Sequence, residues 1–156
     1  MTTRTYASPA AFKQALEQRL RSSTKTGPEF ARKRQLLVFD RFLARLVAEF
    51  ADAMILKGGL VLELRLARAR TTKDIDLRLS GLPHDLLARL QAAARHDAGD
   101  SMTFEVAPDQ DHPEIQNDGM QYDGLRFRVE CSIPSRRTSR KSSTPTRCRV
   151  SVRTRE

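Results

Sequence analysis

The sequence has no apolar run approaching the roughly 20 residues that a helix needs to cross a lipid bilayer. Its first residues, Met1–Tyr6, also lack the apolar stretch and small-residue cleavage site of a secretory signal. Only two cysteines are present, Cys131 and Cys148, which is too few for a disulfide framework. We therefore expect a protein of the reducing cytoplasm that has no membrane partner.

The net charge is small over most of the chain. The 156 residues carry a formal net charge of +9 and are 39% hydrophobic, which fits one globular domain and argues against a fibrous or wholly disordered protein. Residues 135–156 alone hold eight basic residues and one acidic residue, which leaves a net charge of only +2 over residues 1–134. The overall charge therefore gives no reason to expect a nucleic-acid-binding face on the folded part.

Hydrophobic periodicity predicts an α+β core over residues 1–134, divided into N-terminal helices (8–50) and a mixed helix-and-strand unit (53–133). Ser8 and Pro9 are suited to the N-cap and first position of a helix. A second helix is predicted from about Glu29 to Phe50. Its apolar stripe comprises Leu36, Phe39, Leu43, Leu46, Val47 and Phe50.

The second unit mixes short strands with helices. The predicted strands are 53–56, 74–80, 102–106 and 125–133, and the predicted helices are 60–66 and 83–95, with a polar, acidic loop at 108–124. Strands and helices that are interspersed in this way predict a mixed sheet with flanking helices.

Residues 135–156 differ from the rest of the chain. They contain nine Ser or Thr beside the eight basic residues, and almost no apolar residue except Val150 and Val152. Such a segment buries too little surface to offset its ordering entropy, so we expect a disordered tail. It is either a basic interaction arm or an out-of-frame or fusion-derived end; we favour the latter, because the preceding strand has no evident partner.

One stretch carries the residue types of phosphoryl chemistry. Asp74 and Asp76 alternate on a predicted strand and so share one face, where their charges repel unless a cation sits between them. Mg²⁺ suits such a pair, because it takes carboxylate and phosphate oxygens. The Gly58-Gly59 turn before a helix offers bare backbone N–H groups to a triphosphate. Together these parts predict a nucleotidyl-transfer site.

Several simpler interpretations stand beside this one. Alternating acids on an edge strand are common, and a glycine pair alone means little, so only the joint pattern is specific. The basic cluster Arg65, Arg68, Arg70 and Lys73 either steers a triphosphate or RNA or is a solvated linker. Asp111-His112 with Glu114 is a weaker metal candidate, and neither cysteine is predicted to be a nucleophile.

Three segments carry a resemblance to a known family: DRFLARL (40–46), LKGGLVLELR (56–65) and ARTTKDIDL (69–77). They resemble the AbiEii/AbiGii toxin family, which comprises nucleotidyltransferases of the DNA polymerase β superfold found in bacterial abortive-infection and toxin–antitoxin systems. The likeness covers about residues 8–133. It implies Mg²⁺-dependent use of a nucleoside triphosphate, with tRNA, another RNA or a protein as acceptor and an antitoxin protein as partner.

The resemblance also implies roles for individual residues. Asp74 and Asp76 would be the metal ligands and catalytic acids, Gly58 and Gly59 would line the phosphate pocket, and Lys57 or Lys73 would contact phosphate oxygens.

The chain departs from the family pattern in two respects. A third carboxylate is expected on a strand near residues 138–152, where the sequence has no acid; Glu130 could substitute, although a surface glutamate is the simpler interpretation. Family members also continue into a helical C-terminal half, so the chain resembles a truncated or frameshifted member. The alternative to an active nucleotidyltransferase is therefore a catalytically defective remnant that only binds nucleotide or an antitoxin.

Overall fold

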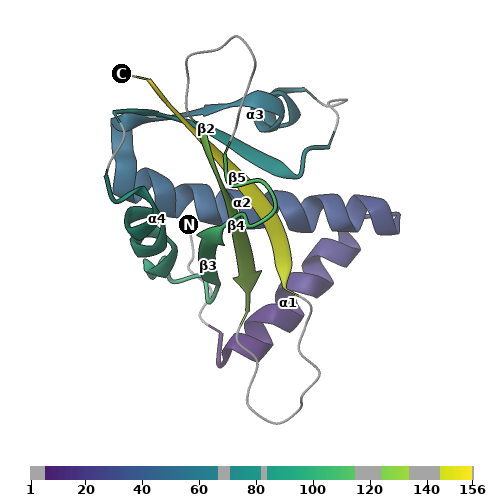
Figure 1. Ribbon diagram of the computed structural model, residues 1–156. Helices are drawn as coiled ribbons and strands as arrows, with labels where there is room; N and C mark the ends of the chain where they lie inside the picture. The colour runs from purple at the N-terminus through teal and green to yellow at the C-terminus, as the bar shows by residue number, and fades with distance from the viewer. Residues whose placement is uncertain (1–5, 67–70, 82–83, 115–123, 134–144, 156) are drawn as a thin grey trace.

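The computed structural model describes residues 6–66, 71–81, 84–114, 124–133 and 145–155. Two helices form the N-terminal part of the fold (Figure 1). The first helix, α1, spans Pro9–Ser22, and α2 spans Gly27–Phe50. As predicted, the Ser8 side chain caps α1, accepting the N–H of Ala11 at 3.2 Å. Among the described residues, no helix is both long and apolar enough to span a membrane.

A five-stranded mixed sheet forms the rest of the scaffold, which confirms the α+β class. Its elements in chain order are a short 3₁₀ turn (Ala51–Ala53), β1 (Met54–Lys57), α3 (Gly58–Arg65), β2 (Asp74–Ser80), α4 (Leu86–Arg95), β3 (Thr103–Pro108), β4 (Gly124–Ser132) and β5 (Thr146–Arg155). The strand order is β1-β2-β5-β4-β3. Only the β2–β5 pair is parallel, and the other three pairs are antiparallel.

The strand β5 corrects the prediction for residues 135–156. It lies at the centre of the sheet, between β2 and β4 (Figure 1), so the disordered tail predicted there is wrong for Thr146–Arg155. Residues 134–144 and Glu156 lie outside the described part. The predicted strand 125–133, observed as β4, consequently has a partner on each side.

The physical reason is an alternation of apolar and polar residues along β5. Cys148, Val150 and Val152 are buried; Arg147 and Arg149 are exposed, and Ser151 is a small polar residue that is also buried. Three buried side chains suffice to dock a strand whose backbone is hydrogen-bonded on both sides, because the ladder satisfies its polar groups.

The two faces of the sheet differ in character. One face is apolar and forms the core with α2 and α4; it includes Ile75, Leu77 and Leu79 of β2 and Phe127 and Val129 of β4. The opposite face carries the alternate residues of the same strands, and most of these are charged and partly or fully exposed. The predicted acids belong to this second, polar face.

The burial of α2 differs in part from the predicted stripe. Phe39, Leu46 and Phe50 are buried as expected, but Val47 is 54% exposed, and Arg45 is buried in its place. Arg45 is accommodated because Asp100 pairs with its guanidinium group through two hydrogen bonds of 2.7 and 2.8 Å. A periodicity argument that counts only apolar residues cannot find such a position.

Candidate functional site

The glycine turn and the second acid are in direct contact. Gly58 is the first residue of α3 and adopts a positive φ of 71°, a backbone conformation that glycine adopts without strain. A Cβ atom on Gly58 would lie 2.9 Å from Cγ of Asp76 and closer still to one carboxylate oxygen. Position 58 is therefore a glycine for two reasons: the turn requires its conformation, and the Asp76 carboxylate occupies the space of a side chain.

The two acids share one face of β2, as predicted. Both are partly exposed, whereas Ile75 between them is fully buried. Burial, together with the nearby charge of Asp74, raises the pKa of Asp76 above its ordinary value. Three cations, Arg153, Arg126 and Lys57, oppose this rise. The expected mutual repulsion is thus present, and the surrounding cations offset it only in part.

The strand expected near residues 138–152 as a partner of 125–133 is β5, which pairs with β4 and, on its other side, with β2. In the parallel ladder Asp74 is opposite Arg149, and Asp76 is opposite Ser151. The positions beside the two acids are therefore an arginine and a serine. Glu130 belongs to β4, two strands from β2, where its carboxylate binds Arg147 at 2.7 Å. It is not a neighbour of the acid pair in the sheet.

A buried glutamate, which the residue patterns did not single out, anchors the loop that leads into β2. Glu63 of α3 accepts a hydrogen bond from the backbone N–H of Thr72 at 2.9 Å and pairs with Arg32 of α2 at 2.9 Å. The Thr72 hydroxyl in turn lies 3.2 Å from both the backbone N and the carbonyl O of Asp74. Glu63 therefore fixes the chain next to Asp74. The available signal was an acid placed among leucines in a short helix.

The six predicted site residues line two hollows, and each hollow includes one of the two glycines. Lys57, Gly58 and Asp76 line one, together with Ser151 and Arg153. The other is lined by Gly59, Lys73 and Asp74, with Thr71, Thr72 and the exposed side chains of Leu62 and Leu66. The predicted residues are thus divided between two hollows, and Lys57 and Lys73 line different ones. Arg68 and Arg70 lie outside the described residues.

A third hollow lies beside Asp74 and is rich in arginine. It is lined by Lys73, Asp74, Arg128, Arg147, Cys148 and Arg149. Asp109, which is only 2% exposed, lies 3.7 Å from Arg128 and 3.6 Å from Arg149. Burial opposes ionisation of Asp109, but backbone N–H donors and these two arginines outweigh it and lower its pKa. Asp109 therefore holds the two arginines as an ionised group.

The acid pair suits a hard divalent cation. Its donors are carboxylate oxygens on one face of β2, and burial, followed by the charge of Asp74, raises the pKa of Asp76. Within the described ranges there is no group of three or more His, Cys, Asp or Glu residues able to hold a metal. A metal ion at this pair would have two carboxylates as protein ligands, and Mg²⁺ commonly takes its remaining ligands from water and substrate phosphates.

The other candidates from the sequence do not form sites. Asp111 pairs with Arg128 at 3.3 Å, so that guanidinium group competes with any metal there. Cys131 and Cys148 are buried, and burial raises their thiol pKa values to about 11 and about 12. Thiols with such pKa values stay protonated at neutral pH and are poor nucleophiles.

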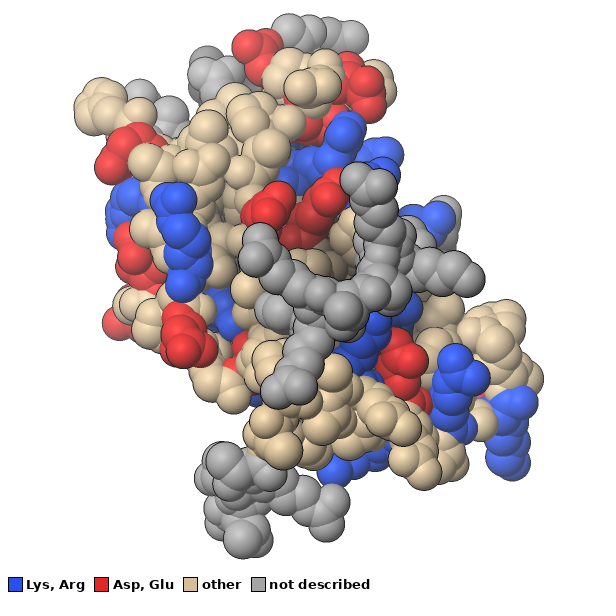
Figure 2. Space-filling view, turned by 90° about the horizontal axis from the view of Figure 1, so that it is seen from below, with Lys and Arg blue, Asp and Glu red and all other residues tan. Residues whose placement is uncertain are grey.

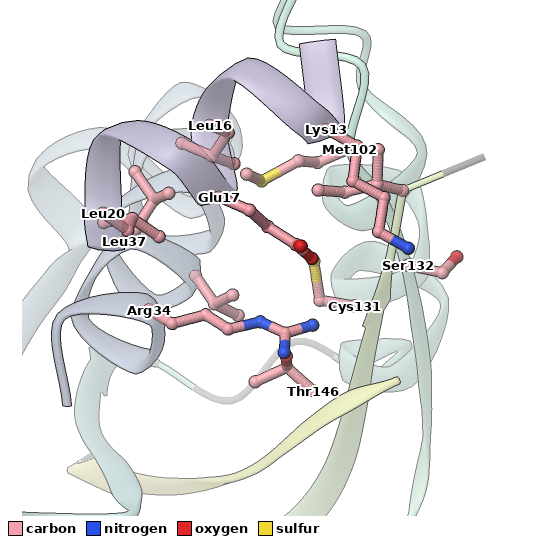
Figure 3. A pocket seen from close by; sticks show the side chains of 12 residues that line it. Lys13, Leu16, Glu17, Leu20, Arg34, Leu37, Met102, Cys131, Ser132 and Thr146 are labelled. Carbon is pink, nitrogen blue, oxygen red and sulfur yellow. The ribbon is translucent and has the colours of Figure 1, made fainter. Parts of the chain in front are cut away.

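A small pocket lies on the other face of the sheet, between α1, α2 and the adjoining ends of β4 and β5 (Figure 3). Its lining mixes leucines with Lys13, Glu17 and Arg34. The open volume is about 30 Å³, comparable with a single water molecule. None of the predicted site residues lines this pocket, and it is too small for a nucleotide.

Acidic and basic side chains are intermixed on the face of the molecule seen in Figure 2. Figure 2 shows groups of Asp and Glu next to groups of Lys and Arg, rather than one large area of a single sign. This agrees with the low net charge outside residues 135–156. On this face, attraction of a polyanion would come from local groups of cations.

Comparison with solved structures finds similar proteins from Helicobacter pylori. The crystal structure of JHP933 gives a TM-score of 0.47 at 18% identity, over 78% of this chain and 44% of that chain. A second H. pylori protein, described as a candidate nucleotidyltransferase, gives 0.44 at 17% identity, over 74% of this chain and 44% of that chain. The present chain thus spans less than half the length of each of these structures.

Comparison with curated proteins gives no significant match. Residues 41–156, by contrast, match a family described as the nucleotidyl transferase AbiEii toxin of type IV toxin–antitoxin systems. The match begins within α2 and includes the glycine turn, the acid pair of β2 and the whole of β5. The chain therefore belongs to the AbiEii nucleotidyltransferase toxin family.

Proposed function

We propose that this chain binds a nucleoside triphosphate together with Mg²⁺ and transfers a nucleoside monophosphate to a hydroxyl group of an RNA or protein acceptor. Asp74 and Asp76 would hold the metal ion, which when bound would neutralise charge on the phosphates. The proposal also includes an antitoxin protein as the partner that restrains the activity. Family membership supports the general class, and the local geometry supports the residues.

The contact between Gly58 and Asp76 carries the proposal. It brings the start of α3, with its free backbone N–H groups, against a carboxylate whose ionisation is disfavoured. A triphosphate at the turn and a cation at the acids would be immediate neighbours, and each would offset the other's charge. Lys57 and Arg153 line the same hollow and would add positive charge to the phosphates.

The transfer would be a displacement at the α-phosphorus. The acceptor oxygen forms a bond to phosphorus, the bond to the β-phosphate oxygen breaks, and pyrophosphate leaves with the electron pair while the acceptor proton passes to water. The residues of this chain would align the triphosphate and stabilise charge in the transition state, which is the main contribution of proteins to phosphoryl transfer.

Label transfer from each of the four α-³²P ribonucleoside triphosphates, with total RNA or protein as acceptor, tests the proposal. We expect Asp76→Asn, and equally removal of Mg²⁺ by a chelator, to abolish transfer. Asp52→Asn is the matched control, because Asp52 is an exposed aspartate outside the site. Transfer by Asp76→Asn at the wild-type rate would exclude the proposed role of the acid pair.

A second candidate function is nucleotide or antitoxin binding without turnover. The observation that favours it is the pair of residues beside the acids on β5, which are Arg149 and Ser151 rather than a third carboxylate. This alternative predicts that triphosphate raises the melting temperature while no label is transferred. Introducing a carboxylate by Ser151→Asp, opposite Asp76, would then be expected to increase Mg²⁺ affinity.

A further inference from the structure

We infer that the third hollow is a phosphate-binding pocket that adjoins the hollow at Gly59 and shares Lys73 and Asp74 with it. Its cationic lining residues are Lys73, Arg128, Arg147 and Arg149, and Asp74, one of the acid pair, lines it as well. Its volume is about 280 Å³, enough for a phosphate group with attached atoms. The existence of this pocket does not depend on the transfer reaction; only its assignment to a substrate rests on the proposed function.

The sheet places the three arginines side by side. Arg128 of β4 is directly opposite Arg149 of β5, and Arg149 is opposite Asp74 on its other side. Arg147 lies two residues before Arg149 and therefore projects from the same face of β5. The backbone ladder thus fixes neighbouring starting points for the three arginine side chains on one face of the sheet.

Carboxylates hold these arginines in place. Asp109 is buried and lies near both Arg128 and Arg149, and Glu130 binds Nε of Arg147 at 2.7 Å. Each guanidinium group has five N–H donors, and these contacts use only some of them. Arg147 and Arg149 have side chains that are 66% and 59% exposed, which leaves their other donors accessible.

The ligand chemistry that fits is a phosphate group. The planar fork of arginine matches two phosphate oxygens at once, and three arginines and a lysine line this hollow. Two sources can provide the phosphate: the pyrophosphate part of the triphosphate, or a phosphodiester of an RNA acceptor. The position of Asp74 between this pocket and the glycine turn allows either, because both substrates must meet at the acid pair.

The test measures binding without Mg²⁺, so that it stays informative even if the transfer reaction is absent. The two probes are inorganic pyrophosphate, followed by calorimetry, and a single-stranded RNA decamer, followed by fluorescence anisotropy at several salt concentrations. We expect Arg147→Ala to weaken one probe or both by about tenfold. For the RNA decamer, loss of one phosphate contact should also lower the slope of log affinity against log salt by about 0.7.

Two further variants separate this result from a folding defect. Arg95→Ala removes an exposed arginine on α4 that does not line the pocket, and we expect it to leave both affinities unchanged. Glu130→Gln removes the carboxylate that competes for Arg147, so it should tighten phosphate binding, which partial unfolding cannot do.

A loss of affinity confined to pyrophosphate assigns the pocket to the triphosphate, and a loss of affinity confined to RNA assigns it to the acceptor. Equal affinities for Arg147→Ala, Arg95→Ala and the wild type would overturn the inference, as would binding of an oligoglutamate peptide in preference to both probes.

Discussion

The Asp76 carboxylate occupies the volume that a side chain at position 58 would fill. This relationship links two segments that are separate in the sequence, the turn after β1 and the strand β2, and it makes the glycine as much a part of the site as the acid. The antiparallel register of β1 and β2, in which Lys57 is directly opposite Asp76, brings them together. A register slip by one residue would turn Asp76 toward the core face.

Replacing Gly58 by alanine should therefore cost more than replacing other glycines with the same backbone. Gly58→Ala would strain a positive φ and displace Asp76, whereas Gly81 has a φ of 79° and nothing within 4 Å of its Cβ position. We expect Gly81→Ala to lower the free energy of unfolding by about 1 kcal/mol. Gly58→Ala should lower it further and also remove Mg²⁺-dependent stabilisation by triphosphate, measured by thermal unfolding.

A double-mutant cycle isolates the contact itself. If the Asp76 side chain is the obstacle, Gly58→Ala should cost less in an Asp76→Ala background than in the wild type, with a coupling of at least about 0.5 kcal/mol. Additive effects would mean that the backbone conformation alone explains the glycine.

The acids of the site and of the arginine pocket should change stability in opposite directions. The folded-state pKa of Asp76 is raised, so its ionisation penalises the folded state as the pH rises through that value. The pKa of Asp109 is lowered, so it stabilises the fold above its ordinary pKa, and this contribution is lost as the pH falls through the lowered value. Without Mg²⁺ at pH 7, Asp76→Asn should therefore stabilise the protein and Asp109→Asn should destabilise it.

Urea unfolding between pH 3 and pH 8 measures both effects. Each difference from the wild type should shrink in acid, because below the ordinary aspartate pKa of 3.8 the Asp76 side chain is already neutral, and at lower pH Asp109 becomes neutral as well. A stability loss for Asp76→Asn at pH 7 would show that the cations around it outweigh burial and repulsion.

Glu63 should affect metal binding although it lies outside the ligand set. Glu63→Ala would leave the Thr72 N–H and the Arg32 guanidinium group without their acceptor, a loss of about 1–3 kcal/mol in the free energy of unfolding. The Thr72 hydroxyl contacts the backbone N and the carbonyl O of Asp74. We therefore expect the Mg²⁺ affinity in the presence of triphosphate to fall as well. Glu63→Gln keeps an acceptor for Thr72 and should recover most of the affinity, measured by calorimetry.

The matched control for Glu63→Ala is Glu105→Ala, because Glu105 is an exposed glutamate on β3. Glu105→Ala should change neither the free energy of unfolding nor the Mg²⁺ affinity. If Glu63→Ala lowers stability but leaves Mg²⁺ affinity of the folded protein intact, then Glu63 supports the fold and has no influence on Asp74.

The local parts of the site could be predicted because their signals are local. Alternation in β2 fixes which residues share a face, and a glycine pair between a strand and a helix indicates a turn. What could not be predicted was the contact of Gly58 with Asp76, since that depends on the antiparallel register of β1 and β2. The role of Glu63 was missed for the same reason, because its partners lie on α2 and on the loop before β2.

The strand β5 was missed because composition outweighed pattern. Its arginines and serine suggested a solvated segment, yet they alternate with Cys148, Val150 and Val152 at a period of two. A central strand needs apolar residues on only one face when the other face of the sheet is open. Deleting residues 135–156 would thus remove the middle of the sheet, and loss of RNA binding in such a deletion would report unfolding instead of a basic arm.

The last prediction concerns the buried cation that the helix pattern did not anticipate. The Arg45 guanidinium group pairs with Asp100, donates to the carbonyl groups of His96 and Met102 and lies 4.7 Å from the ring centroid of Phe104. Arg45→Ala should lower the free energy of unfolding by about 3–5 kcal/mol, because the Asp100 carboxylate and two carbonyl groups would lose their donor. Urea unfolding measures this loss.

The matched double variant decides whether the ion pair or the packing is responsible. In Arg45→Met with Asp100→Asn, the buried charges are gone while most of the volume is kept, so much of the stability should return, and the cycle should show a coupling above about 1.5 kcal/mol. Since Arg45 and Asp100 line none of the three hollows near the acid pair, phosphate and Mg²⁺ affinities of the folded double variant should match the wild type. Additivity within the cycle would place the energy in the carbonyl contacts and the Phe104 ring instead of the Asp100 carboxylate.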